Sequence, residues 1–121
     1  MGYITTGTVV TNSIPNATST IVRQMTIVNP GIYLIESLSL IEIIAADRSM
    51  NINITFPNGG GSMAASTRIT YFGQSNHNAE WPLTGIATIT GSNTQVNYII
   101  FQNTGNSRSV SRIVFQATRI A

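Results

Sequence analysis

Apolar and polar residues alternate with a period of two along much of this chain, and this is the spacing at which side chains share one face of a β-strand. The alternation is most regular in residues 50–56, whose apolar positions are Met50, Ile52, Ile54 and Phe56. It recurs in residues 2–10 (broken at Gly7), 18–28, 67–72, 83–90, 95–102 and 110–120. Turn-forming residues separate these segments, and no long segment has the period of a helix. The pattern predicts an all-β sandwich of about eight strands.

Some details of this pattern can be tested directly against a structure. Within residues 18–28, the alternation assigns Ile21, Met25 and Ile27 to one face and Val22 to the other. Residues 57–62 and 73–82 are predicted to be loops, because they are rich in Gly, Asn, Ser and Pro. Residues 63–65 are compatible with one helical turn.

The segment 32–44, which follows the turn Asn29-Pro30-Gly31, is apolar at almost every position. One face carries isoleucines and leucines and is interrupted by Glu36 and Glu42. The other face carries Tyr33, Ile35, Ile41 and Ile43 with two serines. A strand that is apolar on both faces is covered on both. We therefore expect residues 32–44 to form a central strand, with one face against a neighbouring subunit.

The composition fits one domain that spans residues 1–121, with few charges on its surface. Hydrophobic residues make up 42% of the chain and charged residues 8%, against roughly a quarter charged in a typical globular protein. The six basic residues are all arginines and are not clustered, so nucleic-acid binding is not expected. The chain has no cysteine, which excludes disulfides and thiolate metal sites. No apolar run has the ~20 residues of a membrane span, and the N-terminal residues do not have a signal-peptide pattern.

The predicted loop 73–82 contains the only histidine and the only tryptophan of the chain. We interpret it as a recognition loop, with these ligand-binding candidates: Asn76, His77, Asn78, Glu80 and Trp81. An exposed Trp81 would stack on a sugar or anchor a protein contact, while the asparagines would supply hydrogen bonds. The alternative is that Trp81 turns inward and closes one end of the sandwich. His77 and Glu80 are too few ligands for a dedicated metal site, so we expect no metal and no cofactor.

No pair of residues in the sequence suggests catalysis. Glu36 and Glu42 are six residues apart in one strand, roughly 20 Å, whereas a glycosidase needs two carboxylates roughly 5–10 Å apart. Around a three-fold axis, three copies of one glutamate could bind a cation or pair with arginine. The alternative for each glutamate is a strand end in solvent or an arginine partner in the same chain. We do not expect an enzyme.

A resemblance to a known family rests on Pro30, Gly31 and Tyr33, which lie just before and within the central strand. This segment resembles the Pro-Gly-x-Tyr-x-Phe signature of the TNF-like jelly rolls, the superfamily of the complement-q-type globular heads, with Ile35 in place of the phenylalanine. The closing segment 114–121 is similar to the last strand of bacteriophage fibre heads and bacterial collagen-like surface proteins. No collagen-like Gly-X-Y stalk precedes the domain, and Ile35 departs from the animal pattern. We therefore favour a viral or bacterial relative.

The resemblance implies a jelly-roll sandwich of 8–10 antiparallel strands that assembles as a homotrimer. We place these residues at the subunit interface: Tyr33, Ile35, Tyr98, Ile100 and Phe115. The expected function is that of a bacteriophage fibre head or capsid decoration on the virion surface, which attaches to a host glycan or protein without membrane insertion. Alternatives are a structural trimerisation or capping module and the head of a bacterial collagen-like protein, extracellular or on the spore surface. A monomeric sandwich is the simplest alternative.

Overall fold

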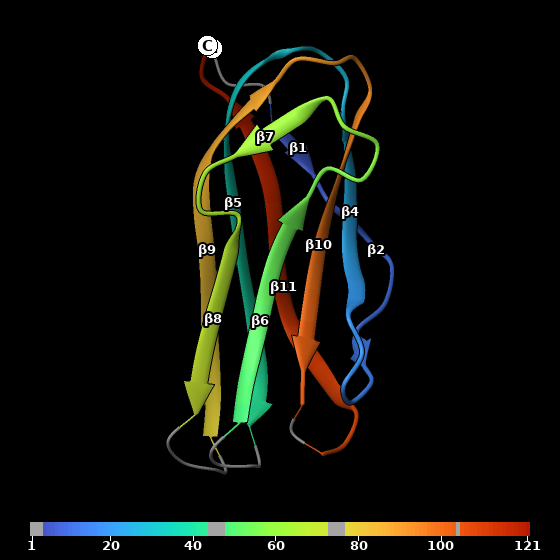
Figure 1. The fold of residues 1–121 in the computed structure, drawn as a ribbon, viewed down its shortest axis with the longest axis vertical. Coiled ribbons are helices and arrows are strands. Elements are labelled where there is room, and N and C mark those ends of the chain that lie inside the picture. The colour runs from blue at the N-terminus through green and yellow to red at the C-terminus, as the bar shows by residue number, and fades with distance from the viewer. Residues whose placement is uncertain (1–3, 44–47, 73–76, 104) are drawn as a thin grey trace.

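Two antiparallel β-sheets lie face to face and enclose the core of this chain (Figure 1). The computed structural model describes residues 4–43, 48–72, 77–103 and 105–121, and for residues 42, 43, 48, 49, 70–72 and 77–79 it describes the main chain alone. The described residues form eleven strands and no helix. The strands are β1 (Ile4–Thr6), β2 (Thr8–Val9), β3 (Ser13–Ile14), β4 (Thr20–Ile27), β5 (Gly31–Ile43), β6 (Arg48–Thr55), β7 (Gly61–Met63), β8 (Thr67–Phe72), β9 (His77–Ile89), β10 (Thr94–Gln102) and β11 (Arg108–Arg119).

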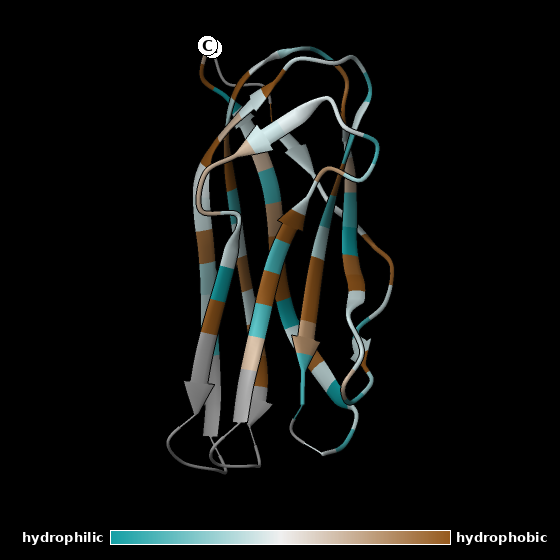
Figure 2. Cartoon of the chain, in the orientation of Figure 1, coloured by the Kyte–Doolittle hydropathy of each residue, from teal (hydrophilic) through white to brown (hydrophobic). Residues whose placement is uncertain are grey.

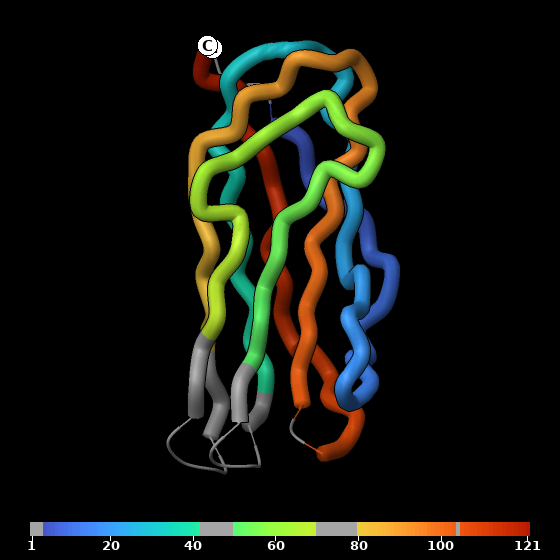
Figure 3. Tube along the Cα trace, in the orientation of Figure 1, coloured from blue at the N-terminus to red at the C-terminus, as the bar shows by residue number. Residues whose placement is uncertain are grey.

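The first sheet has the order β1-β11-β5-β9-β7, with β3 paired to β11, and the second sheet has the order β2-β4-β10-β6-β8. The connections from β4 to β5 and from β9 to β10 cross between the sheets at the end where the C-terminus lies (Figure 3). The predicted all-β sandwich is therefore confirmed. The expected central strand, β5, pairs with both β11 and β9 along most of its length.

Gly7 marks the point at which the chain passes from one sheet to the other. The single strand predicted for residues 2–10 is two short strands, because β1 pairs with β11 and β2 pairs with β4. Between them, the amide of Gly7 donates to the carbonyl oxygen of Phe115 at 2.7 Å. A Cβ atom at position 7 would lie 2.6 Å from the Phe115 ring, so only glycine allows this close crossing.

The predicted alternation in β4 is wrong at Ile21 and Val22. Val22 is buried and Ile21 is partly exposed, which is the reverse of the expected arrangement. The cause is a register shift, since β10 pairs Tyr98 with Arg23 but Ile99 with Ile21, and Val22 is skipped. Such a β-bulge adds one residue to a strand and reverses the faces on one side of it.

The predicted loop 73–82 is also wrong from residue 77 onward, because β9 begins at His77 and continues through Pro82 to Ile89. Proline lacks an N–H group and is confined to edge strands or bulges. At Pro82, β9 pairs with β5 on one side, while β7 covers only its far end, from Ala87 to Ile89. Arg68 from β8 covers the open edge at this point, since its Nη1 donates to the Pro82 carbonyl at 2.7 Å.

The sequence pattern also missed two short paired strands, β3 and β7. Residues 61–63 pair with Ile89–Ala87 of β9, so the helical turn expected at 63–65 is replaced by a strand and a turn. Ala65 in that turn has a φ of 57°. Two or three residues are too few to show a periodicity, and only the pairing partner identifies them as strands.

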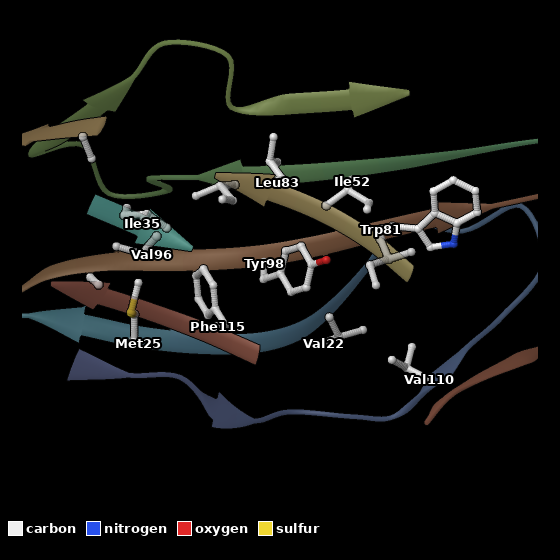
Figure 4. Close-up of a cluster of buried hydrophobic side chains, with 14 of the residues drawn as sticks. Val22, Met25, Ile35, Ile52, Trp81, Leu83, Val96, Tyr98, Val110 and Phe115 are labelled. Carbon is white, nitrogen blue, oxygen red and sulfur yellow. The ribbon is translucent and has the colours of Figure 1, made fainter. Parts of the chain in front are cut away.

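Buried side chains from both sheets form one continuous core (Figure 4). As predicted, the inward positions of β6 are Met50, Ile52 and Ile54, each at most 2% exposed; β6 shows this alternation of hydrophobic and hydrophilic residues in Figure 2. At the centre, the rings of Tyr98 and Phe115 stack with their centroids 5.4 Å apart. One strand of each sheet contributes to this contact, so the pair joins the two sheets.

Candidate functional site

The two apolar faces of β5 have different environments. The face with Tyr33, Ile35 and Ile41 is buried together with Ser37 and Ser39, whereas the other face is only half-buried. The serines are compatible with the core because each hydroxyl is bonded: Ser37 Oγ donates to the Leu83 carbonyl at 2.7 Å, and Ser39 Oγ accepts from Tyr98 Oη at 3.0 Å. Buried polar groups with partners cost little.

The residues that we expected at a subunit interface belong to this core. Each of them is 0–3% exposed within a single chain: Tyr33, Ile35, Tyr98, Ile100 and Phe115. A side chain that is already enclosed by its own protomer has no surface left for a second one, so the structure assigns all five to the interior of the protomer. Periodicity identified the two faces of β5 but did not indicate which of them faces the second sheet.

The opposite face of the first sheet carries a group of partly exposed aliphatic side chains. The pairing registers arrange them in rows across the strands: one row contains Ile4, Thr118, Leu34 and Ile86, and another contains Val114, Leu38 and Pro82. Ile4, Ile86 and Val114 are 62%, 49% and 41% exposed. We call the following residues the apolar face: Ile4, Ile32, Leu34, Leu38, Leu40, Ile86 and Val114. Monomeric proteins rarely expose large continuous apolar surfaces.

A polar row crosses the middle of the apolar face. Glu36 lies opposite Gln116 on one side and Thr84 on the other. The Gln116 Nε2 donates to Glu36 Oε1 at 3.2 Å. Glu36 therefore has a partner in its own chain, but this partner is a glutamine amide and not the arginine that the sequence suggested. The main chain of Glu42 lies in β5, and its side chain is outside the described residues.

The two predicted recognition residues whose side chains are described, Glu80 and Trp81, lie on opposite faces of β9. Trp81 is 9% exposed and belongs to the core, with the Arg68 guanidinium 5.9 Å from its ring centroid. The inward alternative thus describes Trp81, and its ring is not available for stacking on a sugar. Glu80, its neighbour in β9, is exposed on the opposite face, because successive strand residues alternate. Asn76 lies outside the described residues, and only the main chain is described for His77 and Asn78.

Two groups near the core have shifted pKa values. Burial raises the pKa of Tyr98 above its usual value, although its contacts with the Ser39 and Ser37 hydroxyls and with the Arg23 charge oppose the shift. Burial also lowers the pKa of Arg23, and attraction to Tyr98 partly offsets that effect. The Arg23 guanidinium donates to Thr11 O at 3.1 Å, Val22 O at 2.7 Å and Asn12 Oδ1 at 2.8 Å. These bonds hold the segment before β3 against β4.

A cavity and the acidic side chains among the described residues bear on ligand and metal binding. A cavity of about 70 Å³ is lined by Thr5, Val28, Asn29, Tyr33 and Arg119, well below the roughly 300–1,000 Å³ of typical ligand pockets. Among the described residues, no three His, Cys, Asp or Glu side chains group closely enough to hold a metal. Nor do these residues include a helix that is long and apolar enough to cross a membrane.

Solved structures that superpose on almost the whole chain establish the fold. Murine APRIL at pH 5.0 superposes with a TM-score of 0.64 at 12% sequence identity, over 99% of this chain and 100% of that chain. Eiger TNF from S. frugiperda superposes with a TM-score of 0.63 at 8% identity, over 100% of this chain and 92% of that chain. The fold is a TNF-like jelly roll. Neither a protein-family profile nor a curated protein sequence matches the chain.

The TNF-like jelly roll confirms the fold class that the Pro30-Gly31 segment and Tyr33 suggested. The likeness to these structures is one of fold, since 8–12% identity carries no residue-level correspondence. Two broad sheet faces are available: the apolar face of the first sheet and the outward face of the second sheet.

Proposed function

We propose that this chain is a homotrimeric TNF-like head domain that assembles through the apolar face. The observation that carries the proposal is the outward side of the first sheet, on which Leu34, Leu38 and Ile86 remain partly exposed in one chain. Cores of obligate interfaces are apolar and poor in charge. TNF-like folds commonly form homotrimers, which favours three copies over two. Burial of this face would also remove from solvent the exposed side chains of Ile4, Ile86 and Val114.

We further propose that the trimer is the head of a viral fibre or capsid decoration, most consistent with a bacteriophage, and that it attaches the particle to a host surface. The likeness of segment 114–121 to the last strand of phage fibre heads supports this role. Such a head would lie on the virion surface, and its partner would be a host glycan or protein. A structural capping module, or the head of a bacterial collagen-like protein on the cell or spore surface, is the competing role.

The molar mass in solution tests the assembly. Light scattering on a sizing column should give about 39 kDa, three times the 13.0-kDa chain. The variants Leu38→Asp and Ile86→Asp should shift the mass toward 13 kDa, because each places a carboxylate without a partner in the interface. Val9→Asp is the matched control: Val9 is 64% exposed in β2 of the second sheet, and the mass should not change.

A wild-type mass near 13 kDa, or variants that remain trimeric, would contradict the use of the apolar face. Far-ultraviolet circular dichroism of each variant must match the wild type, so that a change in mass is not mistaken for unfolding. A trimer that binds neither intact host cells nor their surface polymers would favour the structural capping module over attachment.

A further inference from the structure

The outward face of the second sheet differs from the apolar face in composition. Most of its side chains are uncharged amides and hydroxyls: Gln24, Asn51, Asn53, Thr55, Thr67, Gln95 and Asn97. We call this set, together with Ile69, Ile99 and Phe101, the amide face. The inward neighbours on β6 and β10, such as Ile52 and Tyr98, are buried, and the alternation therefore points the amide face away from the core. Asn97 is the exception in exposure, because it lies on this face but is only 4% exposed. It includes no charged residue among those whose side chains are described.

Part of the amide face is held in place by hydrogen bonds between its own side chains. Asn97 Oδ1 accepts from Gln24 Nε2 at 3.0 Å and from Gln95 Nε2 at 3.2 Å. Asn53 Oδ1 accepts from Thr67 Oγ1 at 2.7 Å. These contacts fix the side chains before any ligand arrives, which lowers the conformational entropy that binding must remove.

Two other residues on the same face make no side-chain hydrogen bond with the described residues. Neither Asn51 nor Thr55 makes a side-chain hydrogen bond in the part of the chain that the structure describes. A primary amide has two donors and an acceptor, so Asn51 presents its full capacity to a ligand. The register places Asn51 between Phe101 of β10 and Ile69 of β8, and Ile69 is 54% exposed. An unsatisfied amide thus lies between an aromatic ring and an aliphatic side chain.

From this arrangement we propose that the amide face binds a neutral polysaccharide, with Asn51, Asn53 and Phe101 at the centre of the site. Sugar hydroxyls both donate and accept, as amides do, and the apolar side of a sugar ring can lie on Phe101. The proposal rests on the attachment role proposed above and names the ligand class and the site for it.

The lack of charged side chains among the described residues of the amide face favours a neutral ligand. Removing an anion from water is costly unless a cation replaces the lost solvation, and the described amide face has no cation to offer. An acidic polysaccharide or a nucleic acid is therefore disfavoured. Protein interfaces take most of their affinity from Trp, Tyr and Arg anchors, which the described side chains of this face lack.

The test measures depletion of the wild-type protein from solution by bead-coupled dextran, mannan, galactomannan and starch, with dextran sulfate as the charged counterpart of dextran. We expect at least one neutral polymer to bind and dextran sulfate to bind less tightly than dextran. Asn51→Ala and Phe101→Leu should each weaken binding about fivefold to tenfold, the loss expected for one hydrogen bond or one ring contact. The matched control is Asn29→Ala, which makes the same chemical change at an exposed residue of the turn before β5.

No binding to any neutral polymer, unchanged binding by Asn51→Ala, or binding to dextran sulfate alone would each overturn the proposal. The assembly is tested separately, because a monomeric Leu38→Asp variant keeps the amide face intact. Retained glycan binding by that variant supports the site, whatever the mass of the wild type. Conversely, a trimer that binds no neutral polymer refutes the site and leaves the assembly standing.

Discussion

The hydrogen bond between Tyr98 and Ser39 is a polar link between the two sheets inside an apolar core. Both residues are 0% exposed, and Tyr98 Oη donates to Ser39 Oγ at 3.0 Å. In Tyr98→Phe, the ring can remain stacked on Phe115 while Ser39 loses its donor. A buried polar group without a partner costs about 1–3 kcal/mol. We therefore expect Tyr98→Phe to lower the free energy of unfolding by about 2 kcal/mol.

The reverse substitution provides the internal control. Ser39→Ala should also destabilise the fold, because it removes the acceptor at 3.0 Å from the Tyr98 hydroxyl and leaves that hydroxyl only its contact with Ser37. In the double variant, neither hydroxyl is left to lose its hydrogen-bond partner. The double variant should therefore lose less free energy of unfolding than the sum of the losses in the two single variants. The coupling free energy should be about 1–2 kcal/mol, within the usual range for residues in contact.

Urea unfolding followed by circular dichroism measures these differences. With an m-value of about 2 kcal/mol/M, a loss of about 2 kcal/mol lowers the urea midpoint by about 1 M. All variants must be compared at one protein concentration, because assembly would make the apparent stability depend on concentration. Strictly additive effects of Tyr98→Phe and Ser39→Ala would refute the reasoning, since they would show that the two hydroxyls do not depend on each other.

Three further predictions follow from the core. Because burial raises the pKa of Tyr98, the hydroxyl stays protonated in the folded state at a pH near 10, where the unfolded state ionises. The free energy of unfolding should therefore fall above that pH by up to about 1.4 kcal/mol per pH unit. Urea midpoints between pH 8 and 11 should show this fall, and the fall should be less steep in Tyr98→Phe. Gly7→Ala should cost about 1–3 kcal/mol, because its Cβ would lie 2.6 Å from the Phe115 ring; a thermal midpoint equal to that of the wild type would contradict this. Trp81→Ala should lower the free energy of unfolding by about 3–5 kcal/mol, as measured in a urea titration. A variant that is as stable as the wild type but has lost ligand binding would instead support the interpretation of a recognition loop.

Long elements with a strict alternation were predictable from the sequence. The strict alternation of apolar and polar residues in β6 predicted both a strand and its inward positions, such as Ile52. The long apolar run at residues 32–44 predicted the central strand β5. The resemblance to the TNF-like fold was suggested by Pro30 and Gly31 at the start of this strand. In each case the local pattern and the global fold favour the same structure.

The errors occur where a distant partner overrides the local pattern. Pro82 and the Gly- and Asn-rich residues before it favour a loop by composition, yet the backbone from His77 pairs with β5 across thirteen residues. Pro82 is tolerated because its strand is at an edge, which no local property of the sequence shows. In β4, the bulge at Val22 reverses which side chains face the core. The bulge exists only in the pairing of β4 with β10, so the sequence of β4 alone does not reveal it.

The choice between the two faces of β5 explains why the site was misplaced. Both faces looked apolar, and Tyr33 and Ile35, on the face with two serines, were assigned to the subunit interface along with the resemblance to the TNF-like jelly rolls. Burial energetics reverse this choice, because a serine hydroxyl is satisfied by one neutral partner, as Ser37 is by the Leu83 carbonyl, whereas a buried carboxylate needs a cation or several donors. Glu36 has a single bond of 3.2 Å from Gln116, so its face must be the one that meets solvent in the free protomer. In β5, the acidic residue Glu36 therefore identifies the outward face, which the number of apolar residues on either face does not.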